Sequence, residues 1–195
     1  MEHLTDRQAQ IIAESVNIIS EQGIQGLTIK NLSKRIGISE PAIYRHFESK
    51  IDILLTILNT FHQDKKLALT RIATGSLPAL AKLEEIYFHH FQTFTGNPAL
   101  TAVIFSEEIF KNEARLSEKV LSIMTTNQQI IGDILKNGQD TNEIRDDISV
   151  QQLSLIIQGS LRLLVTQWRL AGFSFNLEEN GTELWISVKK LISKD

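Results

Sequence analysis

The sequence contains no cysteine, only three prolines and only two tryptophans in 195 residues. Without cysteine, a disulfide framework and a thiolate metal site are excluded, and nothing favours secretion. The chain also lacks a run of about eighteen apolar residues, and its first segment, MEHLTDRQAQ, is charged instead of apolar. We therefore expect no membrane span and no signal peptide, and a globular protein of the cytoplasm.

What the sequence does contain is helix-like patterning along most of its length. Apolar residues make up 42% of the chain and recur mostly at helical spacing, with few strand signals. We predict an all-α fold of about nine helices, beginning with three helices in the N-terminal part and a longer helix over 51–72. The five further helices are expected at 77–95, 98–112, 114–137, 149–171 and 182–193.

Two capping boxes mark helix starts in the N-terminal part. The first helix is expected to begin with Thr5-x-x-Gln8 and to end near Gly23, and Ser49-x-x-Asp52 opens the long helix. The predicted inward residues of the first helix are Ile11, Ile12, Val16 and Ile19.

The most informative segment, residues 28–50, reads as two short helices joined by a tight turn. In its first half, Ile29, Leu32 and Ile36 share one helical face. Gly37 follows where that helix must end, because glycine enters the left-handed conformation without a Cβ penalty. The pattern predicts a helix, a turn and a second helix.

The second of these helices is expected to begin at Ser39, whose hydroxyl can accept a hydrogen bond from a backbone N–H of the first turn. Pro41 is tolerated in that turn, because the N–H that proline lacks would have no partner within the helix there. Directing Ile43 and Phe47 inward places Arg45 farthest from the core. A short helix that presents small residues and an arginine suits the DNA major groove, which admits one α-helix.

Helix geometry suggests a role for each outward side chain. Arg45 could pair with the O6 and N7 atoms of a guanine, and Ala42 could contact a thymine methyl group. Tyr44, His46 and Lys50 could anchor phosphates.

Local charge weighs against the alternative that this segment is an ordinary helical hairpin in an all-α domain. The segment carries five basic and two acidic residues, a charge of +3 within a chain of net −3. Such a local patch fits a small DNA-binding module. Glu40 is the residue that agrees least with a DNA-binding surface, because its charge is negative. It could accept a hydrogen bond from a cytosine amine, or it could only interact favourably with the positive end of the helix dipole.

The run LTIKNLSKRIGISEPAIYRHFESKIDIL resembles the N-terminal domain of the TetR family of bacterial transcriptional regulators. The likeness covers roughly residues 8 to 58 and rests on the spacing of Gly26, Thr28, Gly37, Ser39, Tyr44, Phe47 and Lys50. Together with the helix geometry, it gives the predicted DNA-binding residues Thr28, Lys30, Ser39, Glu40, Pro41, Ala42, Tyr44, Arg45, His46 and Lys50.

The resemblance also implies a C-terminal domain that responds to a small-molecule effector. We expect a DNA-binding domain at 1–50, a connecting helix at 51–72 and a ligand-binding and dimerisation domain at 73–195. Residues up to 66 contain eight basic and eight acidic side chains, whereas the rest contain twelve and fifteen. The C-terminal part is therefore a poor DNA surface, which supports this division of labour.

Aromatic residues concentrate in the C-terminal part and could line an apolar cavity. The candidate pocket residues are Phe88, Phe91, Phe105 and Trp168. Core packing is the alternative for each of them, because a buried stripe at helical spacing needs no ligand. A cavity with few charges would favour a fatty acyl chain, an aromatic compound or a drug.

The last two predicted helices carry more apolar residues than one small core needs, so some of them must meet another surface. Gly159 and Ser160 remove side-chain bulk there, which allows two copies to approach around a two-fold axis. We predict a homodimer through a four-helix bundle, whose two heads could engage half-sites of a pseudo-palindromic operator about 34 to 36 Å apart. The predicted interface residues are Leu153, Ile157, Gly159, Ser160, Leu164, Leu184, Val188 and Leu191.

No motif indicates an enzyme, a metal site or a cofactor. Neighbouring helical residues point about 100° apart, so His89 and His90 cannot easily chelate one metal. The nucleophile motif G-x-S-x-G and the phosphate loop G-x-x-x-x-G-K-[ST] do not occur. The leading hypothesis is a cytoplasmic repressor that is bound to nucleoid DNA when active. The alternatives are a structural role on the chromosome and a helical enzyme or interaction module without DNA.

Overall fold

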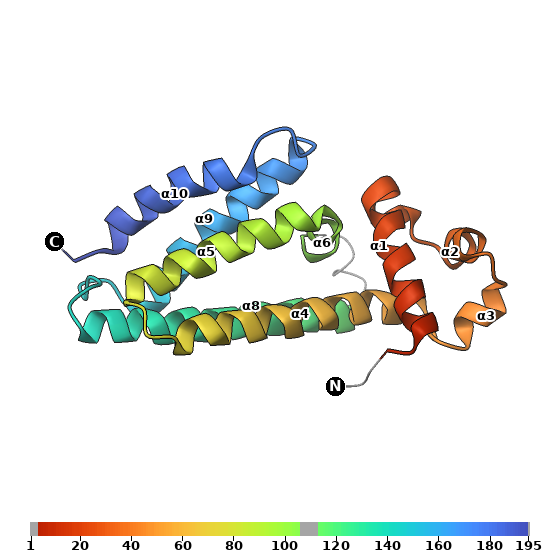
Figure 1. The fold of residues 1–195 in the computed structure, drawn as a ribbon, viewed down its shortest axis with the longest axis horizontal. Helices are drawn as coiled ribbons and strands as arrows, with labels where there is room; N and C mark the ends of the chain where they lie inside the picture. Colours follow the sequence, from red (N-terminus) through yellow and green to blue (C-terminus); the bar gives the residue numbers. More distant parts are fainter. Residues whose placement is uncertain (1–3, 106–112, 195) are drawn as a thin grey trace. The chain divides into compact units, whose positions relative to one another are not determined.

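The computed structural model describes residues 4–105 and 113–194. Within these ranges the chain forms nine helices and no strand beyond an isolated bridge, so the predicted all-α fold is confirmed (Figure 1). The helices are α1 (Asp6–Gly26), α2 (Ile29–Ile36), α3 (Glu40–Tyr44), α4 (Lys50–Thr74), α5 (Ala79–Gly96), α6 (Pro98–Ile104), α8 (Ala114–Asp140), α9 (Val150–Leu170) and α10 (Leu177–Ile192). Of the helix expected at 98–112, the first half is α6, and residues 106–112 lie outside the described residues.

The described chain divides into two compact units. The first contains the residues up to Gln63 together with Pro98–Leu121, and the second contains Asp64–Asn97 together with the residues from Ser122 onward. Helices α4 and α8 each contribute to both units. The packing therefore differs from the linear division expected from the sequence, because α6, expected among the C-terminal helices, packs on α1.

Helix α1 begins at the predicted capping box and bends before it ends. Thr5 and Gln8 form both hydrogen bonds of the box. Gly23 adopts φ 70° and ψ 175°, a conformation that favours glycine, and a last turn follows it. Ile12 and Val16, expected inside, are half-buried because they flank the buried face. That face consists of Ile11, Ser15, Ile18 and Ile19.

The turn between α2 and α3 has the predicted glycine geometry. Thr28 caps α2, since its hydroxyl accepts a hydrogen bond from the Asn31 N–H at 3.1 Å. Gly37 is left-handed with φ 76°, and the N–H groups of Gly37 and Ile38 donate to the Ser33 carbonyl at 3.0 and 3.1 Å. A backbone carbonyl in the last turn of α2 thereby has hydrogen-bond partners without the help of a side chain.

The start of α3 differs from the prediction. Ser39 occupies the N-cap with extended backbone, but its hydroxyl caps none of the described N–H groups of the first turn. Pro41 has no N–H, and the Ala42 N–H donates to the Ser39 carbonyl at 2.9 Å instead. The side-chain cap expected for Ser39 is therefore wrong, although the helix begins where it was predicted.

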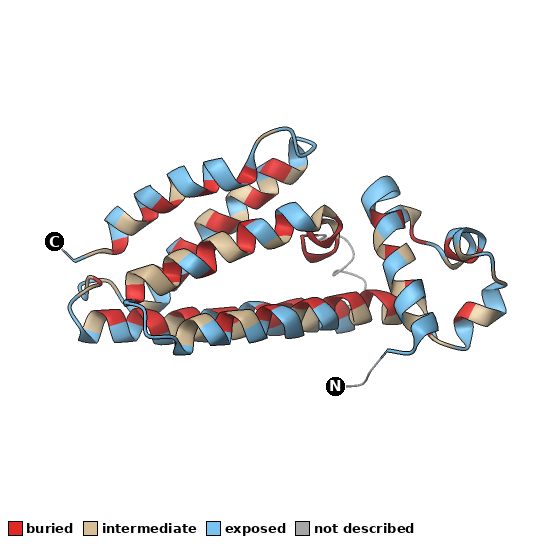
Figure 2. Cartoon of the chain, viewed as in Figure 1, coloured by how far each residue is buried: buried red, intermediate tan, exposed pale blue. Residues whose placement is uncertain are grey.

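In the second unit, α10 packs against α5 and α9, and α5 also packs against α9. Buried residues alternate with exposed ones along each of these helices, as expected for helices with one face in a core (Figure 2). Fully buried Phe91 of α5 lies directly against Gly181 of α10. The ring of Tyr87 meets Phe91 edge-on with centroids 5.1 Å apart, and its hydroxyl lies 3.1 Å from the Ser160 hydroxyl of α9. The three helices thus share one core.

Helix α10 begins at Leu177, earlier than the predicted residue 182. The Asn176 side chain accepts hydrogen bonds from the N–H groups of Glu178 and Glu179 at 3.1 and 3.2 Å, which makes it the N-cap. The polar run before Gly181 resembled a loop in the sequence. The glycine is instead inside the helix, where its missing side chain makes room for Phe91.

Candidate functional site

Helix α3 has one buried and one exposed face. Ile43 and Phe47 are 0% and 6% exposed, and they hold the segment to the core of the first unit. Pro41 and Arg45 are exposed, and Tyr44 is 51% exposed despite its aromatic ring. A guanidinium and a phenol hydroxyl on an exposed helix can donate hydrogen bonds to base edges and phosphates.

The other residues predicted to contact DNA belong to α2, α3, the adjoining turn and the start of α4. The exposed ones are Thr28, Lys30, Ser39 and Glu40. The half-buried ones are Ala42, His46 and Lys50. The first unit therefore brings all ten predicted residues into one segment of structure, with the buried anchors between them.

Arg35 of α2 has a structural role that the sequence reading missed. Its Nη1 and Nη2 atoms donate to the two carboxylate oxygens of Glu21 at 2.6 Å each, and its Nε donates to Glu14 at 3.0 Å. These contacts, chiefly the one with Glu21, raise the pKa of Arg35 and lower that of Glu21. Glu14 and Glu21 are two helical turns apart on α1, and this spacing was the available signal. Arg35 thus fixes α2 on α1.

Lys50 links the beginning of α4 to the end of α1. Its ammonium donates to the Ile24 carbonyl at 3.0 Å, just beyond the bend at Gly23. Partial burial lowers the pKa of Lys50. A lysine has three N–H donors, so the contact with Ile24 leaves it able to bind a phosphate as well.

The first turn of α4 is held by a polar network. The Ser49 hydroxyl donates to one Asp52 carboxylate oxygen at 2.7 Å and accepts from the Asp52 N–H at 3.3 Å. Arg115 of α8 donates to the other carboxylate oxygen at 2.6 Å. The hydrogen bond from Ser49, followed by the one from Arg115, lowers the pKa of Asp52. Sequence reasoning found the Ser49 and Asp52 pair but not Arg115, which is distant in the chain.

The aromatic residues predicted to line an effector pocket are mostly packed within the protein. Phe91 contacts Gly181 and Tyr87, whereas Phe88 is half-buried. The Trp168 Nε1–H donates to a backbone carbonyl at 3.0 Å, and its ring meets that of Phe173 at a centroid distance of 4.6 Å. The fourth residue, Phe105, is buried in the first unit at the end of α6. The ring of Phe91 thus packs on Tyr87, and the ring of Trp168 packs on Phe173.

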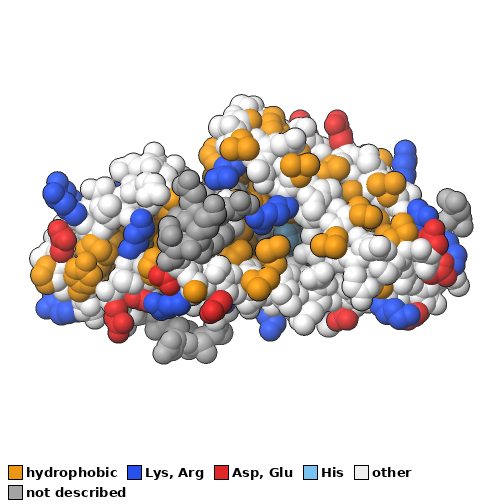
Figure 3. Space-filling view, turned by 180° about the vertical axis from the view of Figure 1, so that it is seen from behind, with side chains coloured by type: hydrophobic (Ala, Val, Ile, Leu, Met, Phe, Trp, Pro, Cys, Tyr) orange, Lys and Arg blue, Asp and Glu red, His pale blue; other side chains and the backbone are white. Residues whose placement is uncertain are grey.

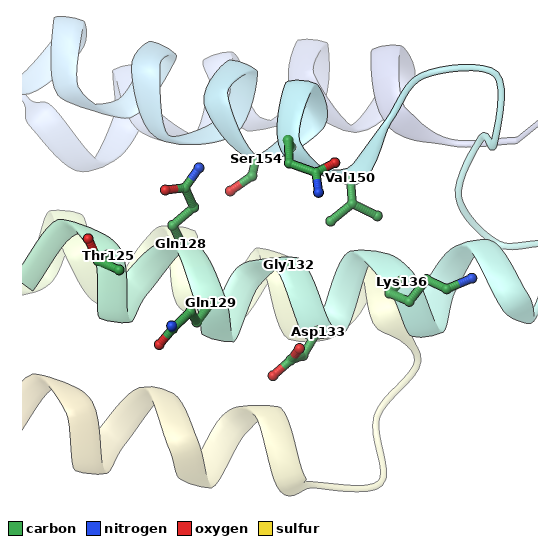
Figure 4. A pocket seen from close by; sticks show the side chains of 9 residues that line it. Thr125, Gln128, Gln129, Gly132, Asp133, Lys136, Val150 and Ser154 are labelled. Atoms are coloured by element: carbon green, nitrogen blue, oxygen red, sulfur yellow. The ribbon is translucent and has the colours of Figure 1, made fainter.

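A groove of about 370 Å³ lies between α8 and α9 in the second unit (Figure 4). Its lining residues are Thr125, Gln128, Gln129, Gly132, Asp133, Lys136, Val150, Gln151 and Ser154. Several of these side chains carry amide, hydroxyl or charged groups, although apolar atoms make up most of the surface that lines the groove. None of the four predicted aromatic residues contributes to it.

Among the residues that the structure describes, no three His, Asp or Glu side chains gather in a way that could hold a metal ion. None of the described helices is both long and apolar enough to cross a membrane.

The first unit defines the class of the protein. A capped helix, a left-handed glycine turn and a second short helix that is followed directly by the exposed Arg45 form a helix-turn-helix, the arrangement that places one helix in the DNA major groove. Ile43 and Phe47 anchor that second helix from behind.

The chain belongs to the TetR family of bacterial regulatory proteins. Residues 11–57 match the family model described as "Bacterial regulatory proteins, tetR family", and residues 58–192 match "YsiA-like protein, C-terminal region". The family membership suggested by the N-terminal segment is therefore confirmed, and the protein is a DNA-binding transcriptional regulator.

Similar proteins include regulators of fatty acid metabolism. The chain is 25% identical over 181 residues to the fatty acid metabolism regulator protein of Bacillus subtilis, with 91% of each chain covered. The structure resembles the fatty acid degradation regulator FadR from Bacillus halodurans, with a TM-score of 0.85, 17% identity and coverage of 96% and 97%. It also resembles FadR from Bacillus subtilis in complex with stearoyl-CoA, with a TM-score of 0.78, 24% identity and coverage of 94% and 96%. These structural likenesses establish the fold.

Proposed function

We propose that this chain is a homodimeric repressor that releases its DNA operator when a hydrophobic small molecule binds the C-terminal region. The observation that carries the DNA-binding part is the exposed face of α3, with Arg45 and Tyr44 outward above buried Ile43 and Phe47. A repressor of this kind works in the cytoplasm, on nucleoid DNA when its operator is occupied.

The dimer is supported by an apolar face on the last two helices. Leu155 and Leu163 of α9 are 63% and 60% exposed, and exposed Gly159 lies between them one turn from each. Further exposed apolar residues are Ile156 and Leu170 of α9 and Ile186 and Leu191 of α10. In Figure 3, hydrophobic side chains lie in separate groups among polar ones on the face that is drawn. An exposed apolar stripe with a glycine in its middle suits close contact with a second copy.

This face differs in part from the interface residues expected from the sequence. Leu153, Ile157 and Val188 are buried within the protomer and cannot be offered to a second copy. Ser160 is half-buried and faces Tyr87. Leu164 and Leu184 are half-buried, and Gly159 and Leu191 are exposed. Helical spacing predicted which two helices would carry the interface, but it did not predict which of their residues face the core and which face solvent. The proposed interface therefore centres on Leu155, Gly159 and Leu163.

An acyl compound is the effector that we favour. Relatives of this chain regulate fatty acid metabolism, and a structural neighbour is described in complex with stearoyl-CoA. The C-terminal region of this chain is itself rich in apolar and aromatic side chains, which suit an acyl chain. Aromatic compounds are the second candidate, since another structural neighbour is a complex of SmeT with triclosan.

The proposed function is tested by isolating the operator and then titrating effectors. The purified dimer would select its binding site from random DNA, and fluorescence anisotropy would follow release of that site by lauric acid, lauroyl-coenzyme A, methyl laurate and triclosan. Release by an acyl compound is the expected result. Undiminished binding in the presence of every compound would contradict the proposed effectors and favour a structural role on the chromosome.

Arg45→Ala is expected to weaken operator binding at one base pair. If Arg45 reads a guanine, its loss costs about 1 to 3 kcal/mol on the operator and little on an operator already mutated at that pair. Anisotropy titrations on both DNAs measure the difference. Lys50→Ala is the comparison variant, because loss of a phosphate contact weakens all sequences alike and lowers the salt slope by about one unit. Equal losses on operator and random DNA for Arg45→Ala would refute the base-reading role.

A further inference from the structure

The residues at the start of α4 carry more negative than positive charge, although they adjoin the helix-turn-helix. Glu48 and Asp52 stand two positions before and after Lys50, so two carboxylates oppose one ammonium. Such a segment repels DNA phosphates, yet Lys50 is a residue for which we propose a phosphate contact. A further cation beside this segment would remove the repulsion.

Arg115 of α8 supplies that cation. Its Nη2 atom lies 2.6 Å from the Oδ1 atom of Asp52, and this hydrogen bond is the main cause that raises the pKa of Arg115. The negative charges of Glu113 and Glu48 raise it further. With the guanidinium in place, the segment that contains Glu48, Lys50 and Asp52 has two positive and two negative charges and is neutral.

The ion pair joins two side chains that are held in place. The Asp52 side chain is only 21% exposed, and it also accepts from the Ser49 hydroxyl at 2.7 Å. On α8, Leu116 follows Arg115 and is 0% exposed, which anchors the first turn of that helix. Arg115 therefore reaches Asp52 from a buried and fixed helix start.

The same ion pair fixes the surroundings of Lys50. Lys50 and Asp52 belong to one helical turn, so a contact that holds Asp52 also holds the backbone of Lys50. On the other side, the Lys50 ammonium donates to the Ile24 carbonyl of α1 at 3.0 Å. The start of α4 is thus tied to α8 through Asp52 and to α1 through Lys50.

We propose that Arg115 is a positioning residue for DNA binding, which acts through Asp52 to keep Lys50 in the position that binds a DNA phosphate. The inference rests on the proposed phosphate contact of Lys50. Arg115 acts without touching DNA: it neutralises the Asp52 carboxylate and holds the first turn of α4. Without the guanidinium, the carboxylate would repel the phosphate and the turn would lose its contact with α8.

Three variants isolate the role of the guanidinium. Arg115→Met removes the charge and keeps a flexible stem, whereas Arg115→Lys keeps a cation that can pair with Asp52. Arg71→Met is the matched control, because Arg71 is an exposed arginine in the part of α4 that belongs to the second unit. Ion pairs between exposed side chains add little to stability, so the melting temperature of each variant should stay near that of the unaltered protein.

Fluorescence anisotropy measures binding of the purified protein to its selected operator and to random duplex DNA. At about 0.1 M salt, Arg115→Met should lower both affinities by a similar factor, roughly tenfold, because one phosphate contact contributes about 0.9 to the salt slope. Arg115→Lys should recover part of the loss, and Arg71→Met should bind like the unaltered protein. In an Asp52→Asn background, Arg115→Met should cause almost no further loss, since no carboxylate remains for Arg115 to neutralise.

The outcomes separate this role from the proposed function. An equal loss in the Asp52→Asn background would show that Arg115 contacts DNA directly, and an equal loss for Arg71→Met would show a general effect of charge; either result overturns the positioning role. Unchanged affinity of Arg115→Met beside a weakened Lys50→Ala also overturns it, while the phosphate contact of Lys50 stands. If Lys50→Ala itself binds DNA like the unaltered protein, that contact fails and the inference fails with it.

Discussion

Gly159→Glu is expected to convert the dimer to a monomer without harming the fold of the protomer. A Cβ at residue 159 would meet no described atom within 4 Å, and a side chain in place of glycine favours a helix interior by about 0.5 to 1 kcal/mol. In the proposed dimer, however, the new carboxylates would stand between Leu155 and Leu163 of each copy, where close approach and an apolar surface are required. The protomer tolerates the change and the assembly does not.

Loss of the dimer should have a large effect on DNA binding. Two linked heads bind two half-sites with an avidity that exceeds that of one head by roughly 100-fold or more. Light scattering at micromolar concentration should give the monomer mass, circular dichroism should stay helical, and operator affinity should fall by that factor. Gly96→Glu is the matched control, because Gly96 is also exposed at a helix position with open space around its Cα. A dimer mass for Gly159→Glu with unaltered operator affinity would exclude this face.

Features that depend on neighbours in the chain could be predicted from the sequence. The capping box of Thr5 and Gln8 and the left-handed turn at Gly37 need only residues within one helical turn, and both occur. The burial of Ile43 and Phe47, which directs Arg45 outward, follows from helical periodicity alone. The helix-turn-helix could therefore be predicted in outline, because the interactions that form it join residues close together in the sequence.

Features that depend on distant residues were missed for the corresponding reason. The Asp52 carboxylate binds Arg115, which lies 63 positions away in the sequence, and the sequence around neither residue predicts this contact. The packing of α6 on α1 likewise has no local signal. Ser39 shows that even a local rule can fail when its usual donor is replaced, here by Pro41. Helical periodicity thus indicated which helices carry an apolar face, but it did not indicate which helix each face packs against.

The contact of Phe91 with Gly181 is the clearest case in which the structure changes the interpretation of a residue. Phe91 was a candidate for the effector pocket, but its ring is 0% exposed and fills the space left by a glycine of α10. The ring also meets Tyr87 edge-on, and Tyr87 is in turn held near Ser160 and against the ring of Trp185. With neighbours on these sides, the Phe91 ring has little freedom to move away from α10.

Gly181→Ala is therefore expected to destabilise the second unit even though alanine is the better helix former. The added Cβ would lie 2.3 and 2.4 Å from the Cε2 and Cδ2 atoms of Phe91, so α5 and α10 must separate or the ring must leave its rotamer. Such overpacking typically costs about 1 to 3 kcal/mol of unfolding free energy. Urea unfolding at fixed protein concentration measures it, with Gly96→Ala as the control that adds a methyl group in open space. Phe91→Leu should recover part of the loss in the double variant, because the smaller side chain makes room for the methyl group.

An unchanged or higher unfolding free energy for Gly181→Ala would contradict this account. It would mean that the Phe91 ring can be displaced at little cost in free energy. A side chain must be displaced in this way when a ligand enters beside it. In that case Phe91 would regain its place among the residues that an acyl chain could contact. A large loss that Phe91→Leu partly reverses would instead identify the ring as a fixed wedge between α5 and α10, and the effector must then bind without moving it.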